Sequence, residues 1–188
     1  MRQTYDECDT SHAKAVKIRN KHLYRDVDIV TASWFHSLDY VLHNKIKERL
    51  EIKIYNKDKG YAESSDYPFL SISRINSRSA ETSGRLKRMI RFFKNVRTDS
   101  GLNISLTSFD INAICYSIPI RDYAKCDYKQ LVHVLWHTMF YLWYDKKEDQ
   151  LKSVIGYEYV FWEKPEKVEA LKKLDDEVYK TKTDLEKV

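Results

Sequence analysis

Glycine is scarce in this chain of 188 residues, which contains 4 Gly and 3 Pro, and no glycine precedes Gly60. Glycine-rich phosphate loops, such as the P-loop and the dinucleotide fingerprint, need glycines at fixed spacings where the backbone approaches the phosphate. The sequence contains neither motif, and its first 59 residues have no glycine from which such a loop could be built.

Cysteine is also scarce, and long apolar runs are absent. Cys8, Cys115 and Cys126 are odd in number and have no C-x-x-C spacing, which argues against a disulfide framework or a zinc site and for a reducing compartment. No run of about 18 apolar residues is present, and the N-terminus has no apolar signal segment. We therefore expect a cytoplasmic protein without a membrane partner.

The composition is that of a protein able to build a core. Hydrophobic residues make up 43% and charged residues 32%, and the length suits one domain, or one compact unit with an appendage. The net charge of +5 mildly favours polyanionic partners.

Residues 82–97 carry the most informative pattern. Lys87, Arg88 and Arg91 lie opposite an apolar helical face, and Lys94 lies at the border between the two faces. Thr82 is the predicted N-cap. A solvated basic face is the ordinary explanation of such cations, and binding of phosphate groups is the alternative. The apolar face comprises Leu86, Met89, Ile90, Phe93 and Val96.

Hydrophobic periodicity predicts strands in the first third of the chain and helices after it. The expected strands are 12–18, 25–32 and 50–55, with 34–42 a strand or an irregular segment and 156–162 an extended one. The expected helices are 70–79, 82–97, 107–118 with a capping box, 128–144, and a charged helix from Pro165 that frays after Tyr179. The fold class is therefore α+β, with an antiparallel sheet packed on a C-terminal helical bundle.

Two pairs of side chains have spacings that suit metal ions. Asp26 and Asp28 share one face of a strand, where two carboxylates can hold Mg²⁺, although a pair neutralised by Arg25 or a lysine is the simpler explanation. His133 and His137 lie at i, i+4 without the glutamate of H-E-x-x-H, so we favour surface positions over a metal site.

Five motifs occur in a fixed order. They are D-I-V-T-A from Asp28, I-K-I-Y-N-K-D-K-G from Ile52, P-F-L-S-I-S-R-I-N-S-R from Pro68, T-S-G-R-L-K-R-M-I-R-F-F-K-N from Thr82 and L-T-S-F-D-I from Leu106. This order resembles the C-terminal two-thirds of the nucleotidyltransferases related to oligoadenylate synthase and cyclic GMP-AMP synthase. It is most similar to the bacterial members, called CD-NTases, that make cyclic di- and trinucleotide signals in antiphage defence.

The resemblance implies the DNA polymerase beta superfamily fold and a set of site residues. It implies that Asp28 is the third metal-binding carboxylate, and hence catalytic, with Asp26 a weaker metal candidate. It implies that Arg91 and Lys94 match an R-x-x-K motif facing the nucleotide, and that Ser108 matches a serine of the next helix. Nucleoside triphosphates would be the substrates, and Mg²⁺ or Mn²⁺ the cofactor of the intact enzyme.

The chain departs from the family at the start. The family's Gly-Ser turn and first D-x-D are missing, and Thr31 replaces a usual proline. We therefore expect residues 1–67 to be a partial nucleotidyltransferase palm and residues 68–188 to be a helical domain. The chain alone is expected to be inactive and to bind no metal, and to need a missing N-terminal segment or a second chain. The alternative is a non-catalytic helical module that binds nucleic acid or nucleotides through its basic helix.

Overall fold

A computed structural model describes residues 7–20, 25–62, 66–124 and 127–187 of the chain. The chain consists of two compact units, Met1–Leu70 and Ser71–Val188. Cys126 lies outside the described residues.

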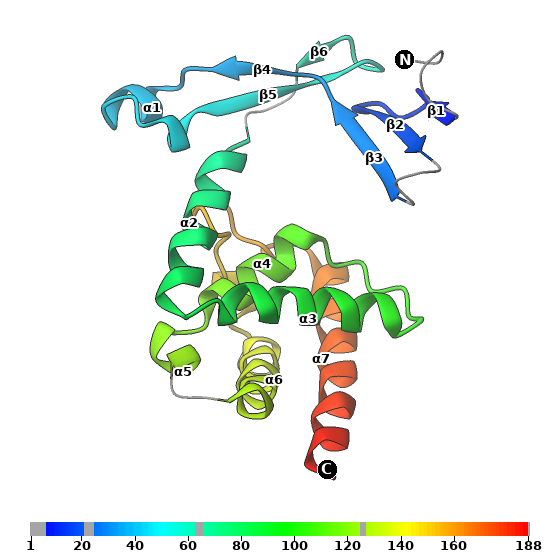
Figure 1. Cartoon of the computed structure of the whole chain (residues 1–188), viewed down its shortest axis with the longest axis vertical. Helices are drawn as coiled ribbons and strands as arrows, with labels where there is room; N and C mark the ends of the chain where they lie inside the picture. The colour runs from blue at the N-terminus through cyan, green and yellow to red at the C-terminus, as the bar shows by residue number, and fades with distance from the viewer. Residues whose placement is uncertain (1–6, 21–24, 63–65, 125–126, 188) are drawn as a thin grey trace. The chain divides into compact units, whose positions relative to one another are not determined.

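The N-terminal unit contains two small antiparallel sheets, shown in blue and cyan in Figure 1. Only Thr31 separates the last strand of the first sheet from the first strand of the second, so the strand expected at 25–32 is divided between the two sheets. The first sheet consists of β1 (Glu7–Asp9), β2 (Ala15–Asn20) and β3 (Arg25–Val30), and the second of β4 (Ala32–Phe35), β5 (Glu51–Asn56) and β6 (Tyr61–Ala62).

The segment 34–42 ends as a helix rather than as one strand. After β4, the side chain of Ser37 accepts a hydrogen bond from the Tyr40 amide at 3.2 Å and caps α1 (Leu38–Leu42). A single turn of 3-10 helix, η1 (Lys47–Arg49), then leads to β5, and the Arg49 guanidinium lies 3.0 Å from the Asp39 carboxylate. A serine at the N-cap outweighs the β propensity of the aromatic residues before it.

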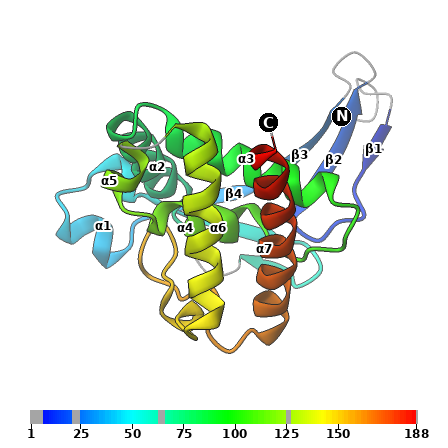
Figure 2. The ribbon, with the colours of Figure 1, turned by 90° about the horizontal axis from the view of Figure 1, so that it is seen from below.

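The second unit is helical (Figures 1 and 2). Helix α6 packs against α7, while α3 packs against α4 and α7. The elements are α2 (Pro68–Glu81), which begins at the end of the first unit, α3 (Arg85–Asp99), α4 (Ser108–Ser117), α5 (Ile120–Ala124), α6 (Tyr128–Tyr144), η2 (Glu148–Gln150) and α7 (Pro165–Glu186). The α+β fold class expected from the sequence is confirmed. No described helix combines the length and apolar character that a membrane span requires.

The apolar face predicted for 82–97 is the buried face of α3. Leu86, Met89, Ile90 and Phe93 are all buried and belong to one continuous core. Leu131 and Leu135 of α6 are in the same core, and Trp136 lies partly buried at its margin. The main neighbours of α3 are α4 and α7.

The start of α3 differs from the prediction. The N-cap is Gly84 with φ of 81°, a left-handed conformation that glycine adopts without a steric cost, and not Thr82. Thr82 still contributes, because its buried hydroxyl donates to the Arg78 carbonyl at 3.0 Å and accepts from the Leu86 amide at 3.2 Å. The hydroxyl therefore joins the end of α2 to the first turn of α3.

Two further expectations for the C-terminal part were wrong. Residues 156–162 form turns and bends rather than a strand, with one isolated bridge between Lys152 and Tyr159. Helix α7 continues past Tyr179 to Glu186, and an ion pair of 2.8 Å between Lys182 and Glu186 supports its last turns.

Candidate functional site

The basic side of α3 carries the cations that the sequence singles out. Arg88 and Arg91 are exposed and Lys94 is half-buried. The Arg88 guanidinium lies 5.2 Å from the centre of the Tyr128 ring, a cation–π contact. No described carboxylate forms an ion pair with Arg91 or Lys94, so both charges are available to an anion.

Lys94 lies near α4. Burial raises the pKa of the Cys115 thiol on α4 far above its usual value, and the positive charge of Lys94 opposes that shift. An interaction of this kind requires the ammonium group to lie within electrostatic range of the thiol. Lys94 thus lies within electrostatic range of Cys115, which is near the C-terminal end of α4.

The start of α4 is held rigidly. The Thr107 hydroxyl accepts from the Asp110 amide at 3.2 Å, and the Asp110 carboxylate accepts from the Thr107 amide at 2.7 Å, which completes the predicted capping box. Asp110 is fully buried and also binds the Lys167 ammonium of α7 at 2.7 Å. These contacts fix the exposed Ser108 at the first turn of α4, where free backbone amides favour negative charge.

The predicted site residues therefore fall in two units. Arg91, Lys94 and Ser108 belong to the helical unit, on two helices that pack together. Asp28 belongs to the N-terminal unit, exposed on β3. Asp26 lies two residues earlier on that strand, and its side chain is outside the described residues.

The surroundings of Asp28 suit a cation only in part. Lys17 is the register partner of Asp28 on β2, so a lysine can neutralise this carboxylate, as the simpler explanation requires. Carboxylates at Asp26 and Asp28 match the oxygen ligands that Mg²⁺ prefers. No cluster of three His, Cys, Asp or Glu suited to a metal occurs among the described residues. The pair fits part of a magnesium site.

His133 and His137 remain surface candidates. Both are exposed on α6, and their ring centres are 6.3 Å apart. His137 lies against the ring of Tyr141, with 4.4 Å between centres. Aromatic contacts of this kind explain the positions without a metal.

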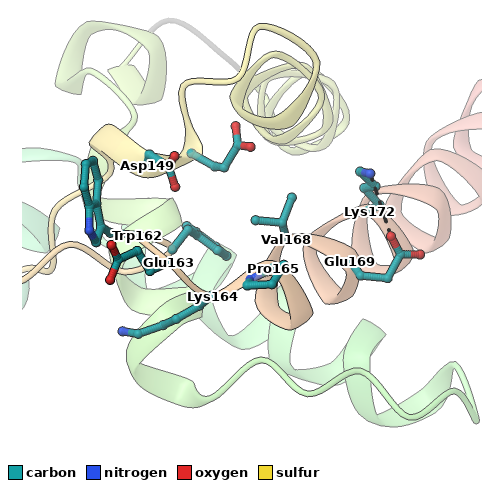
Figure 3. A pocket seen from close by; sticks show the side chains of 10 residues that line it. Asp149, Trp162, Glu163, Lys164, Pro165, Val168, Glu169 and Lys172 are labelled. Atoms are coloured by element: carbon teal, nitrogen blue, oxygen red, sulfur yellow. Dashed lines mark ion pairs between the residues drawn. The ribbon is translucent and has the colours of Figure 1, made fainter.

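A cavity of about 520 Å³ lies beside the start of α7, and sequence analysis gave no signal for it (Figure 3). Its charged lining consists of four carboxylates and two lysines, and Glu169 is paired with Lys172 at 3.7 Å. These residues are Glu148, Asp149, Glu163, Glu169, Lys164 and Lys172. An accumulation of carboxylates repels phosphate groups. This cavity is therefore a poor candidate for a triphosphate site.

Comparison with known proteins gives a family match. Residues 73–182 match the model of the cGAS/DncV-like nucleotidyltransferase C-terminal helical domain. That stretch runs from the second turn of α2 to the last turns of α7 and includes Arg91, Lys94 and Ser108.

Curated and solved relatives extend the match over the rest of the chain. A c-di-GMP synthase of a Lachnospiraceae bacterium is 67% identical over 181 residues, which are 96% of this chain and 52% of that protein. The structure of a STING-associated CdnE c-di-GMP synthase from Capnocytophaga granulosa has a TM-score of 0.88 and 46% identity, covering 99% of this chain and 60% of that one. A second such synthase, from a Flavobacteriaceae species, has a TM-score of 0.84 and 36% identity, covering 98% and 53%. The chain thus spans about half the length of the curated relative.

Proposed function

We propose that this chain, which belongs to the cGAS/DncV-like nucleotidyltransferases, forms the larger part of an enzyme that makes c-di-GMP from GTP. Two observations support the product. The Lachnospiraceae relative, at 67% identity over nearly the whole chain, is a c-di-GMP synthase, and so is the Capnocytophaga granulosa protein that shares its fold. We expect the enzyme to work in the cytoplasm and to make a signal of the antiphage-defence type.

The helical unit would hold the nucleotide. Arg91 and Lys94 lie one turn apart on α3, so both can reach the oxygens of one triphosphate from the same side. Ser108 would contact the nucleoside from the start of α4. The observation that carries this assignment is the half-buried Lys94 ammonium, which lacks a carboxylate partner and lies near α4.

The N-terminal unit would contribute to a metal site. In two-metal phosphoryl transfer, carboxylates hold both ions, and the ions stabilise charge on the attacking and leaving oxygens. Asp28, with Asp26 as a second ligand, would hold part of such a site for Mg²⁺ or Mn²⁺. The remaining ligands and the Gly-Ser turn would come from an N-terminal segment or a second chain that this sequence does not include.

A second candidate function is binding of nucleic acid without catalysis. The exposed Lys87, Arg88 and Arg91 of α3 favour it, because a row of cations can follow a phosphate backbone. This function needs neither Asp28 nor a metal.

Parallel titrations of the 188-residue chain distinguish the two functions. We expect GTP with Mg²⁺ to bind in the micromolar range, and a 30-nucleotide single-stranded RNA to bind no more tightly than a non-specific polyanion. Tight RNA binding that falls steeply between about 50 and 200 mM salt, together with undetectable GTP binding, would instead support the nucleic-acid module.

A further inference from the structure

A groove on α2 carries positive charge that the proposed function does not use. It has a volume of about 350 Å³ and belongs wholly to the helical unit. Two serines and two arginines of α2 line its wall. The two serines are four residues apart, and so are the two arginines, so each like pair is separated by one helical turn. The groove is lined by Ser73, Arg74, Ser77, Arg78, Glu81, Tyr116 and Ile120.

The Arg78 guanidinium is held in place on two sides. One terminal nitrogen donates to the Tyr116 carbonyl at 2.5 Å, and the group lies 4.2 Å from the centre of the Tyr116 ring. Its Nε is buried and has no hydrogen-bond partner among the residues that the structure describes. A buried charged donor without a partner is costly, and such a group calls for an unseen water or ion.

The Arg74 guanidinium is also anchored, because one terminal nitrogen donates to the Val154 carbonyl at 3.0 Å. No described carboxylate forms an ion pair with Arg74 or Arg78. Each arginine has five N–H donors, and these backbone contacts use one of them on each side chain. Two oriented guanidiniums with spare donors form a preorganised site for an oxyanion.

We propose that this groove binds a phosphate group, held by Arg74 and Arg78 with the hydroxyls of Ser73 and Ser77. The residues are distinct from Arg91, Lys94 and Ser108, so the site does not depend on the proposed function. Free phosphate and the 5′-phosphate of a nucleotide offer the same chemistry, and the experiment separates them.

Glu81 allows a second test, in which a substitution should tighten phosphate binding rather than weaken it. Its exposed carboxylate lines the same groove, seven residues after Arg74, or about 10 Å further along the helix axis. A negative charge there opposes a bound phosphate. Removing the charge should therefore tighten binding, whereas removing the Arg74 guanidinium should weaken it.

The experiment follows the Arg78 Nε–H resonance of the full chain by NMR while inorganic phosphate replaces chloride at constant ionic strength. We expect a saturable shift with a millimolar Kd. Arg74→Ala should weaken binding at least tenfold, and Glu81→Gln should tighten it about two- to threefold. Lys94→Ala should leave it unchanged, which separates this site from the α3 site. Thermal melts confirm that each variant is folded.

Three outcomes would overturn the proposal: a shift that does not saturate, a Kd that Arg74→Ala leaves unchanged, or a loss of binding with Lys94→Ala. GMP and guanosine identify the source of the phosphate. Tighter binding of GMP than of phosphate points to a nucleotide, and equal binding points to the free ion. An equal shift with guanosine would show that the base is recognised, which contradicts the proposal.

Discussion

Asp175 is a carboxylic acid buried inside the helical unit. It lies on α7 and is 2% exposed, with Oδ2 accepting from the Trp143 indole at 3.1 Å and Oδ1 without a partner. Burial raises the pKa of this carboxyl to about 6, partly opposed by the Trp143 hydrogen bond and reinforced by the neighbouring charge of Asp176. The charged form therefore costs stability in the folded protein.

The sign of the pH dependence follows from that raised pKa. Between about pH 4 and pH 6 the folded chain binds more protons at Asp175 than the unfolded chain does, so stability falls as pH rises through this window. We expect Asp175→Asn, which keeps an acceptor for Trp143, to raise the free energy of unfolding at pH 8 by about 1–3 kcal/mol and to change it little at pH 4.

Denaturant melts at pH 4, 6 and 8 measure this dependence, with Asp184→Asn at an exposed position of the same helix as the matched control. An equal effect of Asp175→Asn at every pH would show that the carboxyl does not titrate in this range. The burial of Asp175 is not predictable from the sequence, because an acid on a charged amphipathic helix is expected at the surface. Only the packing of α7 on α6 shows that it is buried.

Helix α3 is anchored in the helical core by Phe93. Phe93 is fully buried in the core that unites the helical unit. Truncation to alanine removes a large apolar side chain and leaves a cavity, so we expect Phe93→Ala to cost about 3–5 kcal/mol of unfolding free energy. The exposed Lys87→Ala should change stability by less than about 0.5 kcal/mol. A loss below about 1 kcal/mol for Phe93→Ala in a denaturant melt would mean that α3 packs on its other face.

Helices with strong local signals could be predicted well. The limits of α6, 128–144, agree with the structure because a broad apolar stripe begins directly after the N-cap Asp127. The cap at Thr107 agrees because its hydroxyl and the Asp110 carboxylate form a local, reciprocal pair. Such features depend on residues within one turn of each other, which the sequence contains.

Elements that depend on distant contacts were predicted less well. The N-cap of α3 is Gly84 rather than Thr82, because the Thr82 hydroxyl bonds to the last turn of α2. This contact depends on how closely α2 and α3 follow one another. Residues 156–162 have the composition of a strand, but no described strand pairs with them. Val160 and Phe161 are buried in the helical core instead. Tertiary packing outweighs local propensity in both places.

For the whole molecule, the family and fold class could be predicted because they rest on the order of several motifs along the chain. The candidate site could be predicted only as residue types. That Lys94 lacks a carboxylate partner and lies near α4 required the structure. The joint action of Asp28 with Lys94 stays a prediction, because these residues belong to separate units.

The small number of metal-binding carboxylates leads to a prediction for activity. We expect the 188-residue chain by itself to incorporate no nucleotide from GTP or ATP with Mg²⁺ or Mn²⁺, because one carboxylate pair is too few for two metal ions. Thin-layer chromatography of labelled products measures this directly. A clear product that Asp28→Asn abolishes would contradict the prediction and would make Asp26 and Asp28 the primary metal pair.

The most direct test of the nucleotidyltransferase assignment is isothermal titration of GTP into the wild-type chain and two lysine variants. Lys94→Ala should weaken triphosphate binding by about 1.5–3 kcal/mol, the range for hydrogen bonds to charged groups, without loss of stability. Lys87→Ala removes an equal charge from the exposed side of the same helix and should change binding little. Small and equal losses for both variants would contradict the account and would leave the cations of α3 as a solvated surface.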